Sequence, residues 1–222
     1  INNFSKGIEL DPNYADAYIN RGITYSELGE AQKAIADYDR AIKLAPNDEK
    51  GYLNRGISYG KLEEYQKAIA DFERVLKINS NSPDAYFYLG YAYIFTEKLS
   101  QSIENLSKAI ALDPNNTDIY FYRGSSYLEL QQYERAIADL DRFINKSPDN
   151  KRAYTLRGYS YLLSQKYDRA IEDLDRATEI DPNDNRPYFY RGLVYYYKQK
   201  YQKAIVNYDR ALALNAKDVH SY

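Results

Sequence analysis

Apolar and polar positions along this chain repeat every 34 residues. Each unit opens with a segment whose tyrosines stand seven residues apart, as do Tyr18 and Tyr25, with a glycine between them at Gly22. A second segment follows, in which Ala34 and Tyr38 stand four residues apart. Both spacings place the residues on one face of a helix. The pattern therefore predicts two amphipathic helices per unit, named helix A and helix B, and its fixed period indicates a repeat array.

Six glycines keep the same place in every unit, which we number as position 8 of the repeat. They are Gly22, Gly56, Gly90, Gly124, Gly158 and Gly192. Glycine inside a helix costs about 1 kcal/mol relative to alanine, so its recurrence indicates a packing reason. Together with the alanine usually found at position 20 of helix B, it predicts that the two helices approach closely. A proline at position 32 closes most units and ends helix B, because it cannot donate a helical hydrogen bond.

This combination of aromatic, small and proline positions resembles the tetratricopeptide repeat family, and the resemblance covers the whole chain. It implies an all-α fold, a right-handed superhelical α-solenoid of antiparallel helix pairs whose A helices line a concave side. One unit cannot bury its apolar face alone, so neighbouring units stack. We expect a single array over residues 1–222, a fragment of a longer one. Its full repeats are expected at 15–48, 49–82, 83–116, 117–150, 151–184 and 185–218, with a partial repeat at 1–14 and the start of a further repeat at 219–222.

The composition narrows the possible functions. The formal net charge is −2, and the charged residues, 28% of the chain, mix both signs along the helices. Nucleic-acid binding would require a basic stripe, and no run of 18 apolar residues indicates a membrane span. The chain has no cysteine, and its single histidine, His220, cannot form an imidazole cluster. We therefore expect no enzymatic activity, no cofactor, no metal site and no nucleic-acid partner, and we favour a cytoplasmic location.

An arginine at position 7 departs from the family, whose members usually have an apolar residue there. It occurs in five repeats, as Arg21, Arg55, Arg123, Arg157 and Arg191. Repeat three has Leu89 instead, and it also lacks the acids at positions 23 and 25, which are Asn105 and Ser107. This covariation predicts an Arg–Asp ladder between helices A and B, because arginine suits partly buried bidentate pairs. The acid at position 25 correlates better with the arginine than the acid at position 23 does. The alternative is a basic ladder that binds an acidic ligand.

The tyrosines that the core pattern does not explain indicate a binding surface. Most of the 27 tyrosines fall at positions 4, 11, 17 and 24, where we expect them in the core or between helices. Others occupy positions 6, 9, 12 and 13 of helix A, which in the resembled family face the concave groove together with positions 2 and 5. The predicted groove residues are Asn20, Asn54, Phe87, Tyr88, Tyr91, Phe95, Phe121, Tyr122, Tyr159, Phe189, Tyr190 and Tyr197. The alternative is that these rings only pad neighbouring helices.

The function that we expect is a protein-interaction scaffold that binds a partner peptide or segment in the concave groove. Tyrosine offers a large, stiff contact area with a polar tip, so the aromatic side chains would anchor the segment. The asparagines would hydrogen-bond to its backbone. Two alternatives stay open: the array could self-associate through exposed terminal repeats and build a structural assembly, or it could be the regulatory arm of a larger enzyme.

Overall fold

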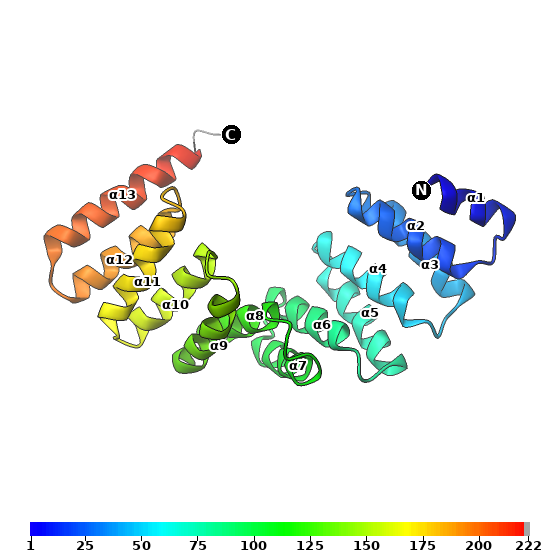
Figure 1. The fold of residues 1–222 in the computed structure, drawn as a ribbon, viewed down its shortest axis with the longest axis horizontal. Helices are drawn as coiled ribbons and strands as arrows, with labels where there is room; N and C mark the ends of the chain where they lie inside the picture. Colours follow the sequence, from blue (N-terminus) through cyan, green and yellow to red (C-terminus); the bar gives the residue numbers. More distant parts are fainter. Residues whose placement is uncertain (220–222) are drawn as a thin grey trace. The chain divides into compact units, whose positions relative to one another are not determined.

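The computed structural model describes the backbone of residues 1–219 and the side chains of residues 1–215, and every regular element in this part is an α-helix. The helices follow one another through short turns (Figure 1). They form two compact units, Ile1–Asn115 and Asn116–Tyr222, named unit 1 and unit 2. The all-α fold of helix pairs predicted from the sequence is therefore confirmed.

Unit 1 begins with a B helix and then contains three A–B pairs. Its helices are α1 (Asn2–Leu10), α2 (Ala15–Glu27), α3 (Ala31–Leu44), α4 (Glu49–Lys61), α5 (Tyr65–Ile78), α6 (Pro83–Phe95) and α7 (Leu99–Leu112). Unit 2 contains three further pairs. They are α8 (Asp118–Glu129), α9 (Tyr133–Lys146), α10 (Lys151–Leu163), α11 (Tyr167–Ile180), α12 (Asn185–Tyr197) and α13 (Tyr201–Val219). The even-numbered helices are thus the A helices of the six predicted repeats, and the odd-numbered ones are B helices.

Local signals in the sequence reverse the chain at both ends of each helix. The turn from helix A to helix B needs one residue in the left-handed region, and Gly29 supplies it with φ of 77°. Glu63 and Gln131 take the same place in later repeats with φ of 60° and 59°. At the turn from helix B to helix A, the side chains of Asp48 and Ser82 accept hydrogen bonds from backbone N–H groups in the first turn of α4 and α6.

The recurring glycine lies where helix A crosses helix B of the same repeat. A Cβ atom at Gly56 would lie 2.6 Å from a ring carbon of Phe72, and one at Gly90 would lie 2.7 Å from Cγ of Leu106. Carbon atoms in favourable contact are about 3.5–4.0 Å apart. The close approach of the two helices, predicted from the repeated glycine, is therefore confirmed.

The core of each unit joins consecutive repeats. In unit 1, Phe72 on α5 and Leu89 on α6 are buried in one apolar cluster. In unit 2, Leu140 and Phe143 on α9 pack in one cluster with Ala153 on α10. The B helix of one repeat therefore buries its apolar side against the A helix of the next, so that each repeat depends on its neighbour for burial.

The last helix differs from the B helices before it. α13 has 19 residues, whereas α5 and α11 have 14. Position 32, a proline in four earlier full repeats, is Ala216 here, so no proline ends the helix at this place. Val219, where we predicted the start of a further repeat, falls within α13. The other residues of that predicted start, 220–222, include His220 and lie outside the described part of the chain.

Candidate functional site

The arginine at position 7 forms a bidentate salt bridge with the aspartate at position 23 of its own repeat. Arg157 donates from Nε and Nη2 to the two carboxylate oxygens of Asp173, at 2.7 and 2.6 Å. The same pair is formed by Arg21 with Asp37, Arg55 with Asp71 and Arg123 with Asp139. A charge-assisted pair with two parallel hydrogen bonds is strong and directional. It ties helix A to helix B inside each of these repeats.

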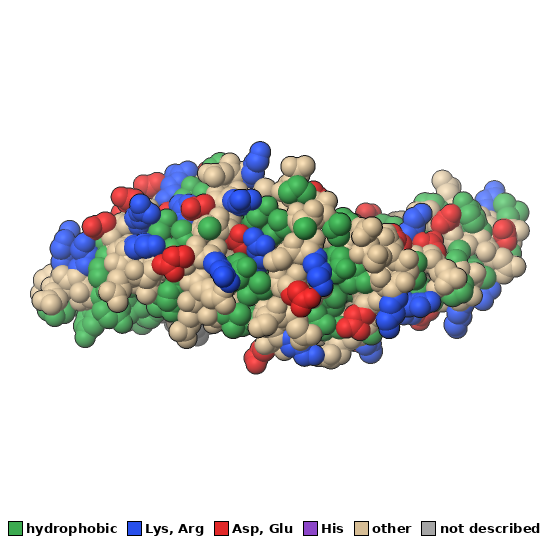
Figure 2. All heavy atoms as spheres, turned by 90° about the horizontal axis from the view of Figure 1, so that it is seen from below, with side chains coloured by type: hydrophobic (Ala, Val, Ile, Leu, Met, Phe, Trp, Pro, Cys, Tyr) green, Lys and Arg blue, Asp and Glu red, His purple; other side chains and the backbone are tan. Residues whose placement is uncertain are grey.

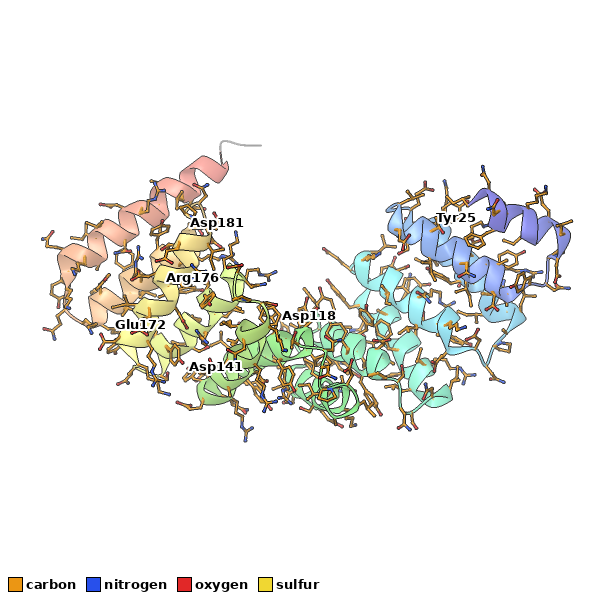
Figure 3. All side chains as sticks on the ribbon, viewed as in Figure 1. Tyr25, Asp118, Asp141, Glu172, Arg176 and Asp181 are labelled. Atoms are coloured by element: carbon orange, nitrogen blue, oxygen red, sulfur yellow. The ribbon has the colours of Figure 1, made fainter. Side chains whose placement is uncertain are left out.

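The same arginines also reach one repeat back. Nη1 of Arg157 donates to Asp141 on α9 at 2.6 Å, and Figure 3 shows where Asp141 lies. Nη1 of Arg55 donates in the same way to Asp39 on α3 at 2.5 Å. The prediction that the acid at position 25, rather than that at position 23, is the better partner for the arginine of its own repeat is therefore wrong. Position 23 holds the bidentate pair, and position 25 binds the arginine of the following repeat.

Repeat three shows how the structure accommodates the missing arginine. Leu89 is 4% exposed, and the side-chain amide of Asn105 donates to the carbonyl of Gln101 at 2.8 Å inside α7. Glu73, the position-25 acid of the preceding repeat, accepts a hydrogen bond from the hydroxyl of Tyr93 at 3.3 Å. Neighbouring side chains thus change together with position 7, as the sequence covariation predicted.

The position-7 arginines use their donors within the chain, which disfavours the alternative of a ligand-binding ladder. Their side chains are only 17–20% exposed. The hydrogen bond to Asp71 raises the pKa of Arg55 and outweighs the opposite effect of burial. The rings of Tyr52 and Tyr59 lie 5.7 and 5.9 Å from the same guanidinium. These arginines therefore have a structural role, and the candidate site lies elsewhere on the A helices.

Two predicted polar residues lie on the A helices α2 and α4 of unit 1. Asn20 is exposed to solvent. Asn54 is half-buried, and its side-chain amide donates to the carbonyl of Lys50 at 2.8 Å within α4. An amide side chain carries both donor and acceptor atoms, so such residues suit hydrogen bonding to a peptide backbone.

Tyr88 on α6 is anchored against the core of unit 1. Its ring stacks on buried Phe72 with a centroid distance of 5.7 Å, and burial raises the pKa of its hydroxyl. Phe87 lies beside it, with ring centroids 5.0 Å apart. Tyr88 is half-buried, so it is a neutral phenol held in place by the core, with part of its surface open to solvent.

Tyr91 and Phe95 form a second aromatic group with Tyr65 of the preceding repeat. Phe95 is 49% exposed and stacks on Tyr65, with centroids 4.6 Å apart and ring planes at 6°. Tyr91 is tilted against Phe95 at 5.0 Å. The sequence argument placed position 17, where Tyr65 stands, only between helices. An aromatic residue at position 17 followed by another at position 13 of the next repeat is the signal that identifies such a pair.

In unit 2, Phe121 lies in the core. It is 8% exposed, and its ring is 5.0 Å from that of Phe143. Phe143 stands at position 27, where the other full repeats have alanine or valine, and its ring gives position 5 a buried partner. The neighbouring Tyr122 is half-buried and meets Phe121 edge-on at 5.4 Å. We therefore leave Phe121 out of the candidate surface and keep Tyr122.

Two tyrosines from consecutive repeats stack on the A helices of unit 2. Tyr159 on α10 and Tyr190 on α12 are both half-buried, with centroids 4.4 Å apart and planes at 19°. Burial raises the pKa of Tyr190, and the hydroxyl of Tyr159 acts in the same direction. Phe189 is 47% exposed, and its ring lies 5.7 Å from that of Tyr190. The structure therefore brings three predicted residues into one aromatic group.

Tyr197 repeats the contact between positions 13 and 17. It is 58% exposed and stacks on Tyr167 of the preceding repeat at 6.3 Å, with planes at 8°. Tyr167 is a second position-17 residue that the sequence argument did not place on this surface. We name the residues Asn20, Asn54, Phe87, Tyr88, Tyr91 and Phe95 the unit 1 face. The unit 2 face comprises Tyr122, Tyr159, Phe189, Tyr190 and Tyr197.

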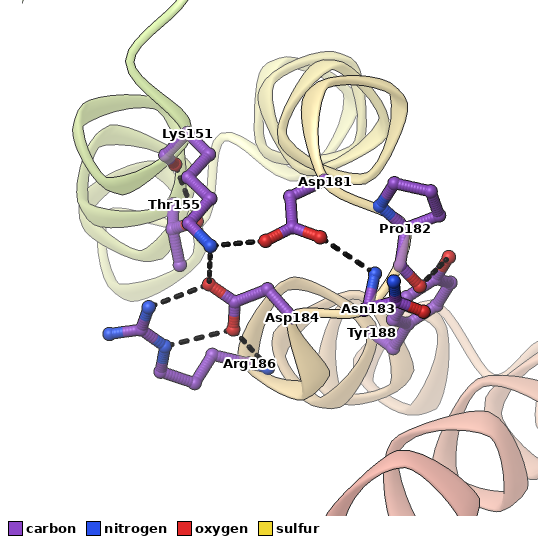
Figure 4. A network of polar contacts seen from close by, with 8 residues as sticks. All are labelled: Lys151, Thr155, Asp181, Pro182, Asn183, Asp184, Arg186 and Tyr188. Carbon is purple, nitrogen blue, oxygen red and sulfur yellow. Dashed lines mark hydrogen bonds and ion pairs between the residues drawn. The ribbon is translucent and has the colours of Figure 1, made fainter.

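An ionic network holds the start of α12 against α10. Lys151 pairs with Asp181 and lies 3.8 Å from a carboxylate oxygen of Asp184 (Figure 4). Asp184 caps α12 and accepts two hydrogen bonds from the guanidinium of Arg186, at 2.9 and 2.6 Å. Burial opposes ionisation of Asp184, but these hydrogen bonds hold its pKa below the ordinary value. The network therefore fixes the two helices that carry the Tyr159–Tyr190 stack.

Other kinds of site were searched for in the described residues. No group of His, Cys, Asp and Glu side chains in this part could hold a metal ion. Among the helices described, none is both long and apolar enough to cross a membrane. Acidic and basic side chains are interspersed on the face shown in Figure 2, in agreement with the mixed charge pattern of the sequence.

Comparisons with known proteins identify the repeat family. Models described as tetratricopeptide repeat match residues 15–48, 49–82, 123–185 and 186–218. A model described as TPR repeat matches residues 96–131. Together these matches cover most of the chain. A search of the curated proteins found no match.

Solved structures with the same fold are numerous. YrrB, described as a TPR protein with an unusual peptide-binding site, is 27% identical, with a TM-score of 0.70 over 81% of this chain and 92% of that chain. MamA from Desulfovibrio magneticus RS-1 is 20% identical, with a TM-score of 0.72 over 76% of this chain and 96% of that chain. At this lower identity the likeness concerns the fold alone.

Proposed function

Because this chain belongs to the tetratricopeptide repeat family, we propose that it is a protein-interaction scaffold that binds an extended segment of a partner protein on the unit 2 face. The peptide-binding site described for YrrB, which is 27% identical to this chain, agrees with this class of function. The tyrosines act as anchors for partner side chains, and their hydroxyl groups hydrogen-bond to the partner backbone.

The observation that carries the proposal is the stack of Tyr159 on Tyr190. Its rings come from two consecutive repeats, so they form a surface that continues from one A helix to the next. Both rings are half-buried and are held by their neighbours before any partner arrives. Side chains that are already ordered lose little conformational entropy on binding, which is the property of a good anchor. Simple padding between helices would not need two polar hydroxyl groups at a half-exposed place.

The unit 1 face offers a different chemistry. Asn20 and Asn54 provide polar contacts on α2 and α4, whereas Tyr88 and Phe95 provide aromatic contacts on α6. Asparagine side chains can pair with both the N–H and the C=O groups of an extended backbone. We propose the unit 1 face as a second contact surface of this kind.

The test uses a random peptide library displayed on phage, selected against residues 1–222. Selected peptides are then titrated against the wild type and against Tyr159→Ala and Tyr190→Ala. We expect each substitution to weaken binding about fivefold or more, since an interface anchor contributes more than about 1 kcal/mol. Tyr14→Ala is the matched control, because Tyr14 is 52% exposed and lies outside both faces. It should bind like the wild type.

Circular dichroism separates this role from core padding. Tyr159→Ala and Tyr190→Ala should keep the helical circular dichroism signal. Tyr120→Ala should reduce that signal, because Tyr120 is only 4% exposed and its loss destabilises the core. If peptides selected on the wild type bind both face variants equally well, the unit 2 face is not the site. If those variants unfold like Tyr120→Ala, the two rings belong to the core and the proposal fails.

A further inference from the structure

Repeat six has an incomplete version of the arginine–aspartate pair. Arg191 stands at position 7, but position 23 of this repeat is Asn207, whereas the other repeats with this arginine have an aspartate there. Nε of Arg191 donates to Oδ1 of Asn207 at 2.7 Å, and Nη1 pairs with Asp175 of the preceding repeat. Within the described residues Nη2 of Arg191 has no hydrogen-bond partner, whereas the same atom of Arg157 donates to Asp173 at 2.6 Å. One donor group of this guanidinium is therefore left for a ligand.

The side-chain amide of Asn207 cannot complete the pair. A carboxylate presents two acceptor oxygens to a guanidinium, whereas an amide presents one oxygen and one NH2 group that only donates. Nδ2 of Asn207 donates instead to the carbonyl of Lys203 at 2.8 Å. Asn207 is 7% exposed, so its side chain is held in this arrangement by the packing of the two helices. The edge of the guanidinium that a carboxylate oxygen occupies in other repeats is therefore open to another acceptor.

Arg191 lines a pocket where α11, α12 and α13 meet, and we name it the Arg191 pocket. Its volume is about 350 Å³. Among the described residues that line it, Arg191 and Lys203 are the cations and Asp175 is the acid. Nζ of Lys203 lies 5.5 Å from the centre of the ring of Tyr195, which also lines the pocket. The ammonium group is therefore held at the same pocket as the unpaired donor of the guanidinium.

Earlier repeats show that the next repeat of the array leaves this surface open. Lys67 and Ala70 of α5 take the places that Lys203 and Val206 have on α13. Both are exposed, although α6 packs against α5 through the apolar side of that helix. The Arg191 pocket therefore lies on a side of helix B that stays in contact with solvent when neighbouring repeats stack.

The Arg191 pocket also lacks an acid that accompanies the lysine in an earlier repeat. In repeat two, Lys67 pairs with Glu64, which stands three residues before it. The equivalent residues of repeat six are Lys203 and Lys200, so a second positive charge stands where the acid would be. Together with the change from aspartate to Asn207, this difference leaves an excess of positive charge at the pocket. Such a site attracts an anion.

The chemistry of the Arg191 pocket favours a carboxylate carried by an amino-acid side chain. In four other repeats Nη2 of the position-7 arginine binds an aspartate oxygen, so this edge of the guanidinium already suits a planar carboxylate. Val206, which also lines the pocket, is 68% exposed. The methylene groups of an acidic side chain gain apolar contact with Val206, whereas a free inorganic anion gains none.

We propose that the Arg191 pocket binds the side chain of an aspartate or glutamate of a partner protein. One carboxylate oxygen accepts a hydrogen bond from Nη2 of Arg191, and the ammonium group of Lys203 attracts the same carboxylate. The pocket shares no described residue with the unit 2 face, so this contact goes beyond the function proposed above and does not depend on the Tyr159–Tyr190 stack.

The test is an NMR titration of the 15N-labelled chain at pH 7 and constant ionic strength. The glutamate probe is N-acetyl-glutamate N-methylamide, and the glutamine probe is its amide counterpart of the same shape. We expect the glutamate probe to shift the signals of Arg191 and of residues 202–207, with a Kd on the order of 1–10 mM for a ligand of this size. The glutamine probe should not shift them. The side-chain signal of Arg157, whose pair with Asp173 is complete, should stay in place with both probes.

Asn207→Asp is the decisive variant, because it supplies the missing carboxylate from within the chain. The same pair exists in four other repeats, so this variant should fold, and it should weaken binding of the glutamate probe about tenfold or more. Lys203→Gln should weaken binding about threefold, as expected for one exposed charge. Lys67→Gln is the matched control at the equivalent position of repeat two, and it should bind the probe like the wild type.

Three results would overturn the proposal: equal shifts with the glutamate and glutamine probes, no saturation below about 100 mM, or unchanged binding in Asn207→Asp. Sodium acetate and inorganic phosphate are titrated in parallel. If phosphate saturates the Arg191 signals at a lower concentration than the glutamate probe does, the pocket takes phosphate and the carboxylate assignment is wrong. If acetate binds as tightly as the glutamate probe, the pocket holds a free anion and not the side chain of a partner.

Discussion

Replacement of Gly56 by alanine should destabilise this protein, although alanine is the better helix former. A Cβ atom at position 56 would lie 2.6 Å from one ring carbon of Phe72 and 3.0 Å from two others. Favourable carbon contacts need about 3.5–4.0 Å, so the ring would have to move by about 1 Å. Phe72 is only 2% exposed and stacks on Tyr88, so its movement would displace the packed neighbours that join repeats two and three.

The expected magnitude follows from two opposing effects. Overpacking a well-packed core costs about 1–3 kcal/mol. Replacing glycine by alanine inside a helix stabilises the folded state by up to about 1 kcal/mol through helix propensity. The net change for Gly56→Ala should therefore be a loss of up to about 2 kcal/mol in the free energy of unfolding, centred near about 1 kcal/mol. Gly60→Ala is the matched control in the same helix, because no atom lies within 4 Å of a Cβ built there. It should be neutral or stabilising by up to about 1 kcal/mol.

Urea denaturation followed by circular dichroism compares the two variants. The midpoint of Gly56→Ala should fall below that of the wild type, and the midpoint of Gly60→Ala should not. Phe72→Leu should be less costly in the Gly56→Ala background than in the wild type, because the two sites are in contact. If both glycine variants stabilise the protein equally, helix–helix contact is not the reason why glycine recurs at position 8.

Two further predictions concern the Arg157–Asp173 ion pair of repeat five and the buried Tyr38 of repeat one. Arg157→Leu leaves Asp173 buried without its partner, so it should lower the free energy of unfolding by about 2–4 kcal/mol. The double variant Arg157→Leu with Asp173→Asn copies Leu89 and Asn105 of repeat three, and its denaturation midpoint should recover most of that loss. A double variant without recovery would contradict the structural role of the position-7 arginines. Burial raises the pKa of Tyr38 from 10.0 to about 12, so this tyrosine ionises at lower pH in the unfolded chain than in the folded one. The resulting stability is fully present below pH 10 and is lost as the pH rises through 12. At pH 11 the free energy of unfolding should be lower by about 1 kcal/mol. Tyr38→Phe, which copies Phe72, should lose less stability between pH 8 and pH 11 than the wild type does, and an equal loss would refute this assignment.

The interior of each repeat could be predicted from the sequence by itself. The spacing of Tyr18, Gly22 and Tyr25 places them on one helical face in any helix, because that geometry depends only on residues per turn. The turn and cap residues end each helix locally, as Asp48 does before α4. The pairing of the position-7 arginine with an acid of helix B was also visible, because both residues change together in repeat three.

Contacts between repeats were decided only by the tertiary structure. Asp141 pairs with Arg157 of the next repeat, Tyr65 stacks on Phe95 of the next repeat, and Tyr159 stacks on Tyr190. Each of these contacts depends on how far one helix pair shifts and turns relative to the next, and residue spacing within a repeat does not contain that information. Burial follows the same rule. Ile69 on α5 is 7% exposed because it packs with residues of α6, whereas Ile205, which takes the same place on α13, is 50% exposed.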